Sequence, residues 1–275
     1  MKTRIITAVV GIVVLIGVLF TFDTLIFNLV ITAITLIALH EIYAALGFEK
    51  QGWPLLGVLV PYTFRLVMPA SFLVVLFYAI YLVVRNGTIS YQKASGLAMF
   101  SGIVIFCFYS FIRLKELLPV EEYGYDAVFF ILLILCFAWG GDTCAYFAGR
   151  AFGKHKLCPV VSPKKTVEGA IGGVLGTMVF GVAATLIYSI AADRMEAFTR
   201  SNIGVSMYVV IALLACVAAV LGIYGDLFAS VVKRQCGIKD YGTIFPGHGG
   251  ILDRFDSVMF IAPFVTMVIT AVFYQ

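Results

Sequence analysis

The sequence predicts an all-α polytopic membrane protein with about nine transmembrane spans. The chain has 275 residues, of which 62% are hydrophobic, and its mean hydropathy is +1.04. A soluble domain of this length would be closer to half apolar, and a water-soluble fold could not bury so much apolar surface. Only 12% of the residues are charged, and the net charge of +4 is too small to indicate a nucleic-acid partner. The positions of the few charged residues along the chain are therefore informative.

Seven apolar runs have roughly the length that a bilayer-spanning helix needs. They cover residues 5–22, 24–46, 94–112, 127–149, 169–192, 205–232 and 257–274. The first run is not followed by a small-residue cleavage site and a polar mature sequence, so we interpret it as an uncleaved span and not as a signal peptide. The segment 52–84 is ambiguous, because it could hold one long span or two short ones split near Arg65 and Pro69.

Basic residues decide the number of spans. The loops 150–168 and 233–256 are rich in Lys and Arg, and the N-terminus carries Lys2 and Arg4. Such segments are expected on the cytoplasmic side of the membrane. An even number of spans must then precede the first basic loop, which requires two short spans within 52–84. We therefore predict nine spans, a cytoplasmic N-terminus and a C-terminus on the opposite side.

The N-terminal half offers little chemistry. His40 and Glu41, near the end of the second apolar run, are a weak catalytic signal, and we expect them to be interfacial or to face the helix bundle. We predict a single integral membrane domain over 1–275. Within it, 1–126 contributes the N-terminal spans and 127–275 is the catalytic half.

Charged residues concentrate in the stretch 222–256, between two apolar runs. Carboxylates are costly at membrane depth and are rarely placed there without a function. Asp226, Ser230 and Lys233 have the spacing i, i+4, i+7, so they share one face of a helix. A buried Asp that only packs against a neighbouring helix is the alternative. The interleaved carboxylates and basic residues favour a site for Mg²⁺ and phosphate instead.

A glycine-rich turn, Pro246–Gly250, follows, and a helix is expected to begin near Ile251. The unpaired N–H groups of that helix start would attract phosphate. Asp253 and Asp256, spaced i, i+3, would face the same way on this helix. Acidic residues in a first helical turn also occur as ordinary partners of the helix dipole, which would explain either residue alone.

A second polar cluster precedes the run 169–192. Asp142 lies near the cytoplasmic end of the sixth span, and Ser162, Lys164 and Lys165 lead into a glycine-rich helix start that suits a phosphate grip. Basic loops beside a bilayer can also be topology determinants or lipid anchors. The glycines at 169, 172, 173 and 176 form a small-residue stripe, which predicts close helix packing more than a ligand site.

The run from Ser230 to Asp256, SVVKRQCGIKDYGTIFPGHGGILDRFD, resembles the C-terminal signature of the phosphatidate cytidylyltransferases, also called CDP-diacylglycerol synthases. The upstream sequences GDTCAYFAGRAFGK and SPKKTVEGAIGG also resemble that family, so the resemblance covers about the C-terminal half. This chain departs from the family pattern at Ala229, where Glu is frequent, and at Tyr241, where Ser is frequent.

The resemblance implies that CTP and phosphatidic acid react to give CDP-diacylglycerol and pyrophosphate, in phospholipid biosynthesis. Carboxylate-bound Mg²⁺, as one or two ions, together with Lys and Arg could neutralise the charge of both substrates. The predicted catalytic residues are Asp226, Asp253, Lys233 and Arg234. The predicted metal ligands are Asp226, Asp253, Asp256 and Asp142. The predicted substrate- and phosphate-binding residues are Ser162, Lys164, Lys165, Ser230, Lys239, His248, Gly249, Gly250 and Arg254.

The expected partners are CTP and membrane phosphatidic acid, with no nucleic acid, and a homodimer is left open. We expect the protein in the inner cell membrane, with its active site at the cytoplasmic side. Two alternatives remain: another CTP-dependent lipid head-group enzyme such as a lipid kinase, and an ion-coupled transporter. A CDP-alcohol phosphatidyltransferase is disfavoured because the DGxxAR-type motif is absent from the sequence.

Overall fold

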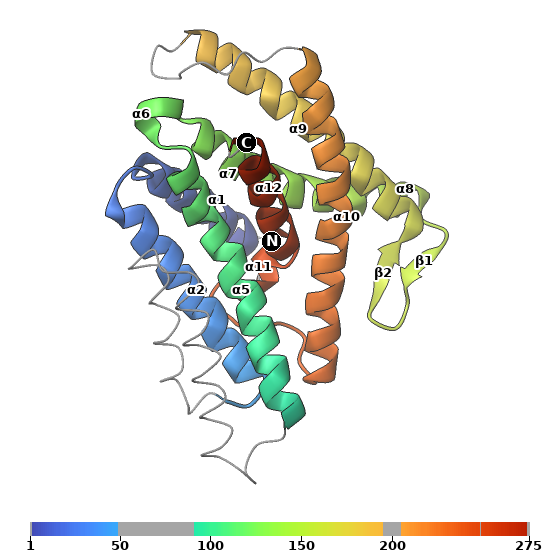
Figure 1. Cartoon of the computed structure of the whole chain (residues 1–275). Helices are drawn as coiled ribbons and strands as arrows, with labels where there is room; N and C mark the ends of the chain where they lie inside the picture. The colour runs from blue at the N-terminus through green and yellow to red at the C-terminus, as the bar shows by residue number, and fades with distance from the viewer. Residues whose placement is uncertain (1, 49–90, 195–204, 248, 274–275) are drawn as a thin grey trace. The chain divides into compact units, whose positions relative to one another are not determined.

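The computed structural model describes residues 2–48, 91–194, 205–247 and 249–273, which are predominantly helical (Figure 1). The chain forms two compact units, each built from segments that are far apart in the sequence. The first unit comprises Met1–Ile112 and Gln235–Phe255, and the second comprises Arg113–Arg234 and Asp256–Gln275. The two short spans predicted within 52–84 lie outside the described residues. The predicted single domain, with N-terminal spans over 1–126 and a catalytic half over 127–275, stays a prediction.

The first unit contains α1 (Lys2–Phe20), α2 (Leu25–Ala45), most of α5 (Tyr91–Leu117) and the short α11 (Leu252–Phe255). Thr24 caps α2, because its side chain accepts the N–H of Ile26. Aromatic pairs join sequence-distant parts of this unit: Phe108 of α5 contacts Phe255 of α11, with their ring centroids 5.2 Å apart. The part of the C-terminal signature that follows α10, residues 236–255, is called the signature loop below, and it belongs to a unit made mostly of N-terminal helices.

The second unit begins with α6 (Val120–Tyr123) and a long irregular helix. That helix consists of α7 (Asp126–Leu135), the π-helical turn η2 (Cys136–Gly140) and α8 (Gly141–Phe152). The hairpin that follows pairs β1 (Lys156–Cys158) antiparallel with β2 (Ser162–Thr166). The remaining elements are α9 (Val167–Arg194), α10 (Val205–Gln235) and α12 (Val258–Phe273). The hairpin lies in the basic segment that the sequence led us to expect as a loop.

Helices α8 and α9 pack antiparallel through the glycine stripe. A Cβ atom added at Gly172 would lie closer than 3.0 Å to the Cβ of Ala148, and one added at Gly176 closer than 3.0 Å to Cys144. A Cβ at Gly173 would lie 3.1 Å from the Cβ of Ala145. The predicted close packing is confirmed, since any side chain on this stripe would push the two backbones apart.

The helices match the seven apolar runs. Five of the described helices are long and apolar enough to cross a membrane, namely Leu25–Ala45, Tyr91–Leu117, Asp126–Phe152, Val167–Ala191 and Ser206–Gln235. Two shorter apolar helices cover Ile6–Phe20 and Val258–Ala271. The total of nine spans stays a prediction, because its remaining two lie outside the described residues.

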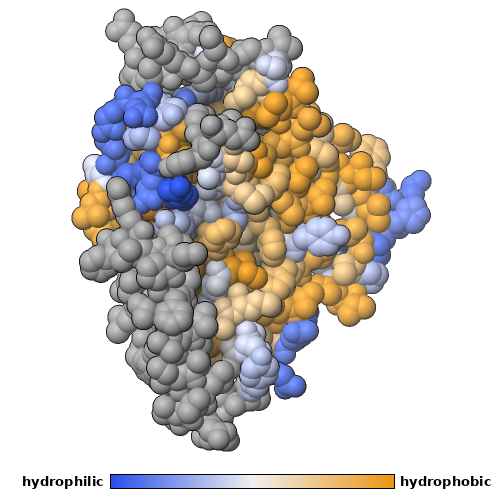
Figure 2. Space-filling model, viewed as in Figure 1, coloured by the Kyte–Doolittle hydropathy of each residue, from blue (hydrophilic) through white to orange (hydrophobic). Residues whose placement is uncertain are grey.

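The second unit exposes large apolar side chains along its long helices. On α9 these include Val179, 68% exposed, and Ile187, 69% exposed, while on α10 Leu213 is 63% exposed. Figure 2 shows a broad hydrophobic surface in the region of α9 and α10. Contiguous apolar surface of this extent is unusual on a soluble protein. Together with the apolar helices it identifies a membrane protein, whose lipid-facing surface includes these residues.

Candidate active site

Carboxylates from three separate segments of the second unit interact electrostatically, because the charges of Asp226 and Asp142 both act on Asp256. Asp142 lies in the first turn of α8, Asp226 lies in α10, and Asp256 lies in the two-residue break before α12. Burial is the largest cause that raises the pKa of Asp256, and the nearby charges of Asp226 and Asp142 add to it, so that its pKa rises to about 7. Burial disfavours the charged form of a carboxyl, and so do like charges beside it. A cation bound among these groups would relieve that repulsion.

Two glycines of α10 allow the segment with Asp256 to lie against this helix. A Cβ at Gly225 would lie 2.5 Å from the carbonyl oxygen of Asp256, and a Cβ at Gly222 would lie 2.8 Å from the Cδ1 of Ile261. Both distances are too short for a real side chain. The close approach of the backbones brings Asp256 toward Asp226, which is one residue after Gly225 in the sequence.

Basic and hydroxyl side chains surround Asp226. The ammonium of Lys165, on β2, forms an ion pair with the Asp226 carboxylate. The hydroxyl of Ser230 donates to Asp226 Oδ1 at 3.2 Å, which confirms that the i, i+4 pair shares one face of α10. Lys233, one turn further along, opposes the rise in the pKa of Asp256. Lys164 is exposed, whereas Lys165 is partly buried.

Ser257 is a site residue that sequence reasoning did not identify. Its hydroxyl donates to Asp142 Oδ2 at 3.1 Å, and its backbone N–H donates to Asp256 Oδ1 at 2.9 Å. The side chain is buried, with 1% of the residue exposed. Ser257 therefore links two of the three carboxylates. The available signal was a hydroxyl residue immediately after the last Asp of the signature.

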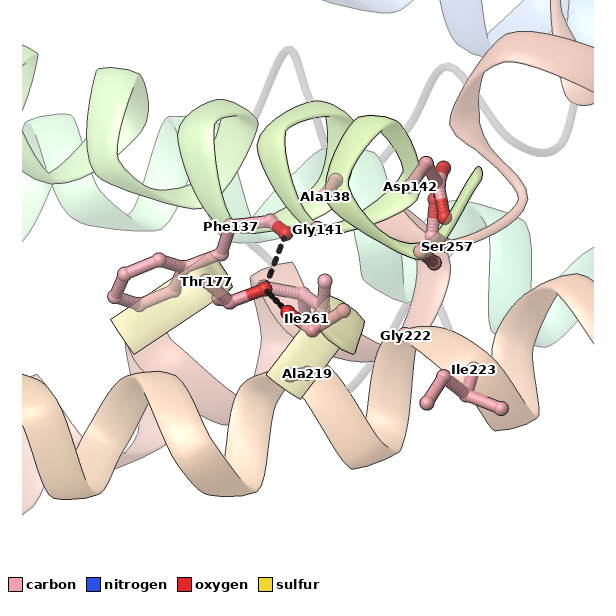
Figure 3. A pocket seen from close by; sticks show the side chains of 12 residues that line it. Phe137, Ala138, Gly141, Asp142, Thr177, Ala219, Gly222, Ile223, Ser257 and Ile261 are labelled. Atoms are coloured by element: carbon pink, nitrogen blue, oxygen red, sulfur yellow. Dashed lines mark hydrogen bonds between the residues drawn. The ribbon is translucent and has the colours of Figure 1, made fainter. Parts of the chain in front are cut away.

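A cleft opens beside Asp142 and Ser257 (Figure 3). It holds about 270 Å³ of space between atoms, part of it open to solvent. Apart from these two polar residues, its walls are mostly apolar or small. They are formed by Phe137, Ala138, Gly141, Ala145, Gly173, Thr177, Ala219, Gly222, Ile223 and Ile261. One end of the cleft therefore carries the Asp142 carboxylate, and the rest of the cleft is mostly apolar.

The π-helical turn shapes one wall of this cleft. Within η2, the carbonyl oxygen of Phe137 accepts the hydroxyl of Thr177 at 3.5 Å, and the same hydroxyl donates to Gly173 O at 2.8 Å (Figure 3). A Cβ at Gly141 would collide with this hydroxyl. Single π-helical turns inside α-helices occur frequently at functional sites. Here the turn ends at Gly140, two residues before Asp142.

The donor set around Asp226 fits Mg²⁺ better than a softer metal. Carboxylate and hydroxyl oxygens are the groups present, and Mg²⁺ is usually held by one or two carboxylates together with water and substrate phosphates. In the described part of the chain, no three His, Cys, Asp or Glu side chains form a ready-made metal cage. A cation bound here would need water or substrate oxygens to complete its coordination shell.

The signature loop in the first unit has its own network. Asp253 is 6% exposed, and its Oδ2 accepts the N–H groups of Tyr241 at 2.8 Å and of Gly250 at 3.0 Å. The two carboxylate oxygens of Glu41 accept the N–H groups of Ile251 and Leu252, each at 2.9 Å. The prediction that this helix start offers unpaired N–H groups to phosphate is therefore wrong. Carboxylates of the protein occupy these donors.

The expectation that Asp253 and Asp256 share a helix face is also wrong. Helix α11 ends at Phe255, and Asp256 lies in the turn that follows. The two residues belong to different units, as do Asp253 and Asp226. The proposed metal pair of Asp226 and Asp253 thus stays a prediction.

The other predicted residues are placed as follows. Three basic residues are exposed, namely Arg234 at the end of α10, Lys239 in the loop and Arg254 in α11. Ser162 opens β2 opposite Cys158. Gly249 has φ +86° and closes a tight turn, since it exchanges backbone hydrogen bonds of 2.9 and 3.1 Å with Phe245. The predicted role of His248 lies outside the described residues.

Comparison with known proteins identifies the family. The model of the cytidylyltransferase family matches residues 2–272. A phosphatidate cytidylyltransferase of Bacillus subtilis is 31% identical over 279 residues, which cover 96% of each chain. Proteins of the same name from Staphylococcus haemolyticus and Staphylococcus epidermidis are 39% and 42% identical over about half of each chain. Since the family model spans nearly all residues, the chain belongs to the cytidylyltransferase family.

Proposed function

We propose that this protein transfers CMP from CTP to phosphatidic acid, giving CDP-diacylglycerol and pyrophosphate. The observation that carries the proposal is the cluster of Asp142, Asp226 and Asp256, with Lys165 paired to Asp226 and a partly apolar cleft beside Asp142. The names of the similar proteins support the same reaction. A lipid with an anionic head and a soluble triphosphate would both reach such a site at the membrane surface.

The reaction needs charge neutralisation more than proton transfer. A phosphate oxygen of phosphatidic acid attacks the α-phosphorus of CTP, and the bond from this phosphorus to the bridging oxygen of the β-phosphate breaks. Pyrophosphate leaves with that oxygen. A phosphate monoester is already largely dianionic at neutral pH, so the nucleophile needs no general base. The barrier lies in bringing two anions together, and fixed cations lower it.

We propose that Asp226 and Asp256, with Asp142, hold Mg²⁺, and that one or two ions bind. The bound cation supplies positive charge and orients phosphate oxygens. The donor atoms of this cluster support this role, because they are oxygens that repel one another when all are charged. Ser257 and Ser230 orient the carboxylates to which they donate hydrogen bonds. That Asp253 also binds metal remains a prediction.

The basic side chains would hold the phosphates. In the second unit, Lys165 and Lys233 lie near the carboxylates and can compensate the charge of a bound triphosphate. In the first unit, Lys239 and Arg254 are exposed on the signature loop, and we propose that they bind substrate phosphate. Arg234, at the end of α10, is proposed to have the same role.

We further propose that the site faces the cytoplasm in the inner cell membrane, where CTP is found. This orientation is based on the concentration of Lys and Arg in the segments 150–168 and 233–256. Cysteines introduced at Val160, 90% exposed, and at Phe245 should be labelled from the same side of sealed vesicles. Labelling from opposite sides would refute both the orientation and a single active site.

The reaction itself is tested with labelled CTP, phosphatidic acid and Mg²⁺ in detergent micelles. Label in the α-phosphate should enter the lipid as CDP-diacylglycerol, whereas label in the γ-phosphate should leave as pyrophosphate. Transfer of the γ-label to lipid would indicate a lipid kinase instead. Absence of any CTP-dependent product, with ion flux in liposomes, would favour the transporter alternative.

A further inference from the structure

Glu41 is a buried carboxylate from the N-terminal half that contacts the signature loop 210 residues later. It lies in α2, near the C-terminal end of that helix, and is 4% exposed. Its Oε1 accepts the N–H of Ile251 and its Oε2 accepts the N–H of Leu252, each at 2.9 Å. Both oxygens therefore bind adjacent backbone donors at the start of α11.

The loop is shaped to receive this side chain. A Cβ added at Gly242 or at Gly250 would lie closer than 3.0 Å to the Glu41 carboxylate. Two glycines, eight positions apart in the sequence, thus leave the space that the carboxylate fills. Neither glycine adopts a left-handed backbone, so the requirement for glycine here comes from space and not from conformation.

A second carboxylate completes the same network from within the loop. Asp253 Oδ2 accepts the N–H of Gly250 at 3.0 Å and of Tyr241 at 2.8 Å. The three consecutive N–H groups from Gly250 to Leu252 are therefore all bound by Glu41 or Asp253. Hydrogen bonds between charged and neutral groups are stronger than neutral ones, especially when buried. This arrangement fixes the backbone between the exposed Lys239 and Arg254.

We infer that Glu41 is a positioning residue for the cytidylyltransferase reaction. Glu41 holds the signature loop so that the side chains of Lys239 and Arg254 can bind substrate phosphate. The inference rests on the proposed function. In this arrangement, side chains bind the phosphate in place of the backbone N–H groups expected from the sequence, because protein carboxylates already accept those N–H groups. This arrangement also gives a residue of the N-terminal half a defined role in holding the signature loop.

Glu41→Gln tests this with little change in size. One amide oxygen can serve only one of the two N–H groups comfortably, while the amide NH₂ opposes the other donor. We expect the KM for CTP to rise about tenfold with kcat changed less than threefold. Asp23→Asn is the matched control, because Asp23 is an exposed carboxylate in the same unit, in the turn before α2. Its kinetics should equal those of the wild type.

A double-mutant cycle separates positioning from general damage. Gly242→Ala should raise the KM for CTP about tenfold in the wild type, because the new methyl group meets the Glu41 carboxylate. In the Glu41→Ala background the same substitution should change the KM for CTP less than twofold, because the three atoms nearest to the new methyl group, all of Glu41, are removed. Equal effects in both backgrounds would overturn the inference. If Glu41→Ala fails to fold, the kinetics of Glu41→Gln still test the inference.

Hydrogen exchange provides a readout that does not depend on activity. The peptide covering 250–255 should exchange at least tenfold faster in Glu41→Gln than in Asp23→Asn. Unchanged exchange would overturn the inference, and so would KM values for both substrates within twofold of the control. A rise in KM for either substrate together with faster exchange supports it. A wild-type protein that makes no CDP-diacylglycerol would refute the proposed function alone, and the exchange experiment would still test the contact.

Discussion

Substituting Gly172 by Ala should destabilise the second unit through the contact between α8 and α9. The added Cβ would lie closer than 3.0 Å to the Cβ of Ala148, whereas carbon atoms in contact are about 3.5–4.0 Å apart. Both atoms are fixed to helix backbones, so the helices must separate by roughly 1 Å or more. Overpacking of this kind costs about 1–3 kcal/mol. The better helix propensity of Ala offsets about 1 kcal/mol of that cost.

The assay is the midpoint of thermal unfolding in detergent micelles, with Gly102→Ala as the matched control. Nothing lies within 4 Å of a Cβ at Gly102, which is exposed in α5, so this variant should be as stable as the wild type or more stable. We expect Gly172→Ala to unfold several degrees lower. Adding Ala148→Gly should restore most of the loss, because it removes the colliding atom. The packing argument fails if Gly172→Ala is as stable as Gly102→Ala, or if Ala148→Gly does not restore stability.

Three further predictions concern the carboxylate cluster. Lys165→Ala removes the ion-pair partner of Asp226 and should lower kcat/KM for CTP at least tenfold, measured by product formation; a change below twofold would contradict its role. Ser257→Ala should lower kcat about tenfold while leaving the unfolding midpoint within a few degrees, because Asp142 loses a hydrogen-bonded partner; unchanged turnover would refute this orienting role. The pKa of Asp256 is raised from 3.8 to about 7, so without divalent cations the native state should lose stability as pH rises from about 4 to 7. This loss of stability is at most roughly 4 kcal/mol, and it should be absent in Asp256→Asn. If the unfolding midpoints of the variant and the wild type depend on pH in the same way, the placement of this carboxyl is contradicted.

The local sequence pattern was sufficient to predict most of the helices. Apolar runs and their lengths predicted α9 and α10 within a few residues, because burial in lipid requires continuous hydrophobic sequence. Spacing predicted that Asp226 and Ser230 share a face, and the hydrogen bond between them agrees. The glycine stripe on α9 predicted close packing for the same reason, since helical periodicity places its members on one side.

Contacts between distant segments could not be predicted in this way. Glu41 was treated as a weak signal because its partners, Ile251 and Leu252, are more than 200 residues away. The hairpin β1–β2 is short, polar and rich in Lys, so its composition did not indicate strands. Its formation depends on cross-strand pairing and on the helices that it connects.

The interruption at Asp256 was missed for a related reason. The sequence pattern is compatible with a helix that continues from α11 into α12, and the break follows from the close approach of this segment to Gly225 on α10. The π-helical turn before Asp142 is likewise set by contacts such as the one between Thr177 and Phe137. Tertiary packing decides both features, and both lie beside the carboxylate cluster.

The most direct test of the carboxylate cluster is the turnover of Asp226→Asn at saturating CTP, phosphatidic acid and Mg²⁺. Asn keeps the size of the side chain but removes the charge that pairs with Lys165 and would hold the cation. Relative to Asp23→Asn, kcat should fall at least a hundredfold, since an interaction that acts in the transition state is lost. The unfolding midpoints of the two variants should agree within a few degrees. A turnover of Asp226→Asn within threefold of this control would contradict the assignment of the active site.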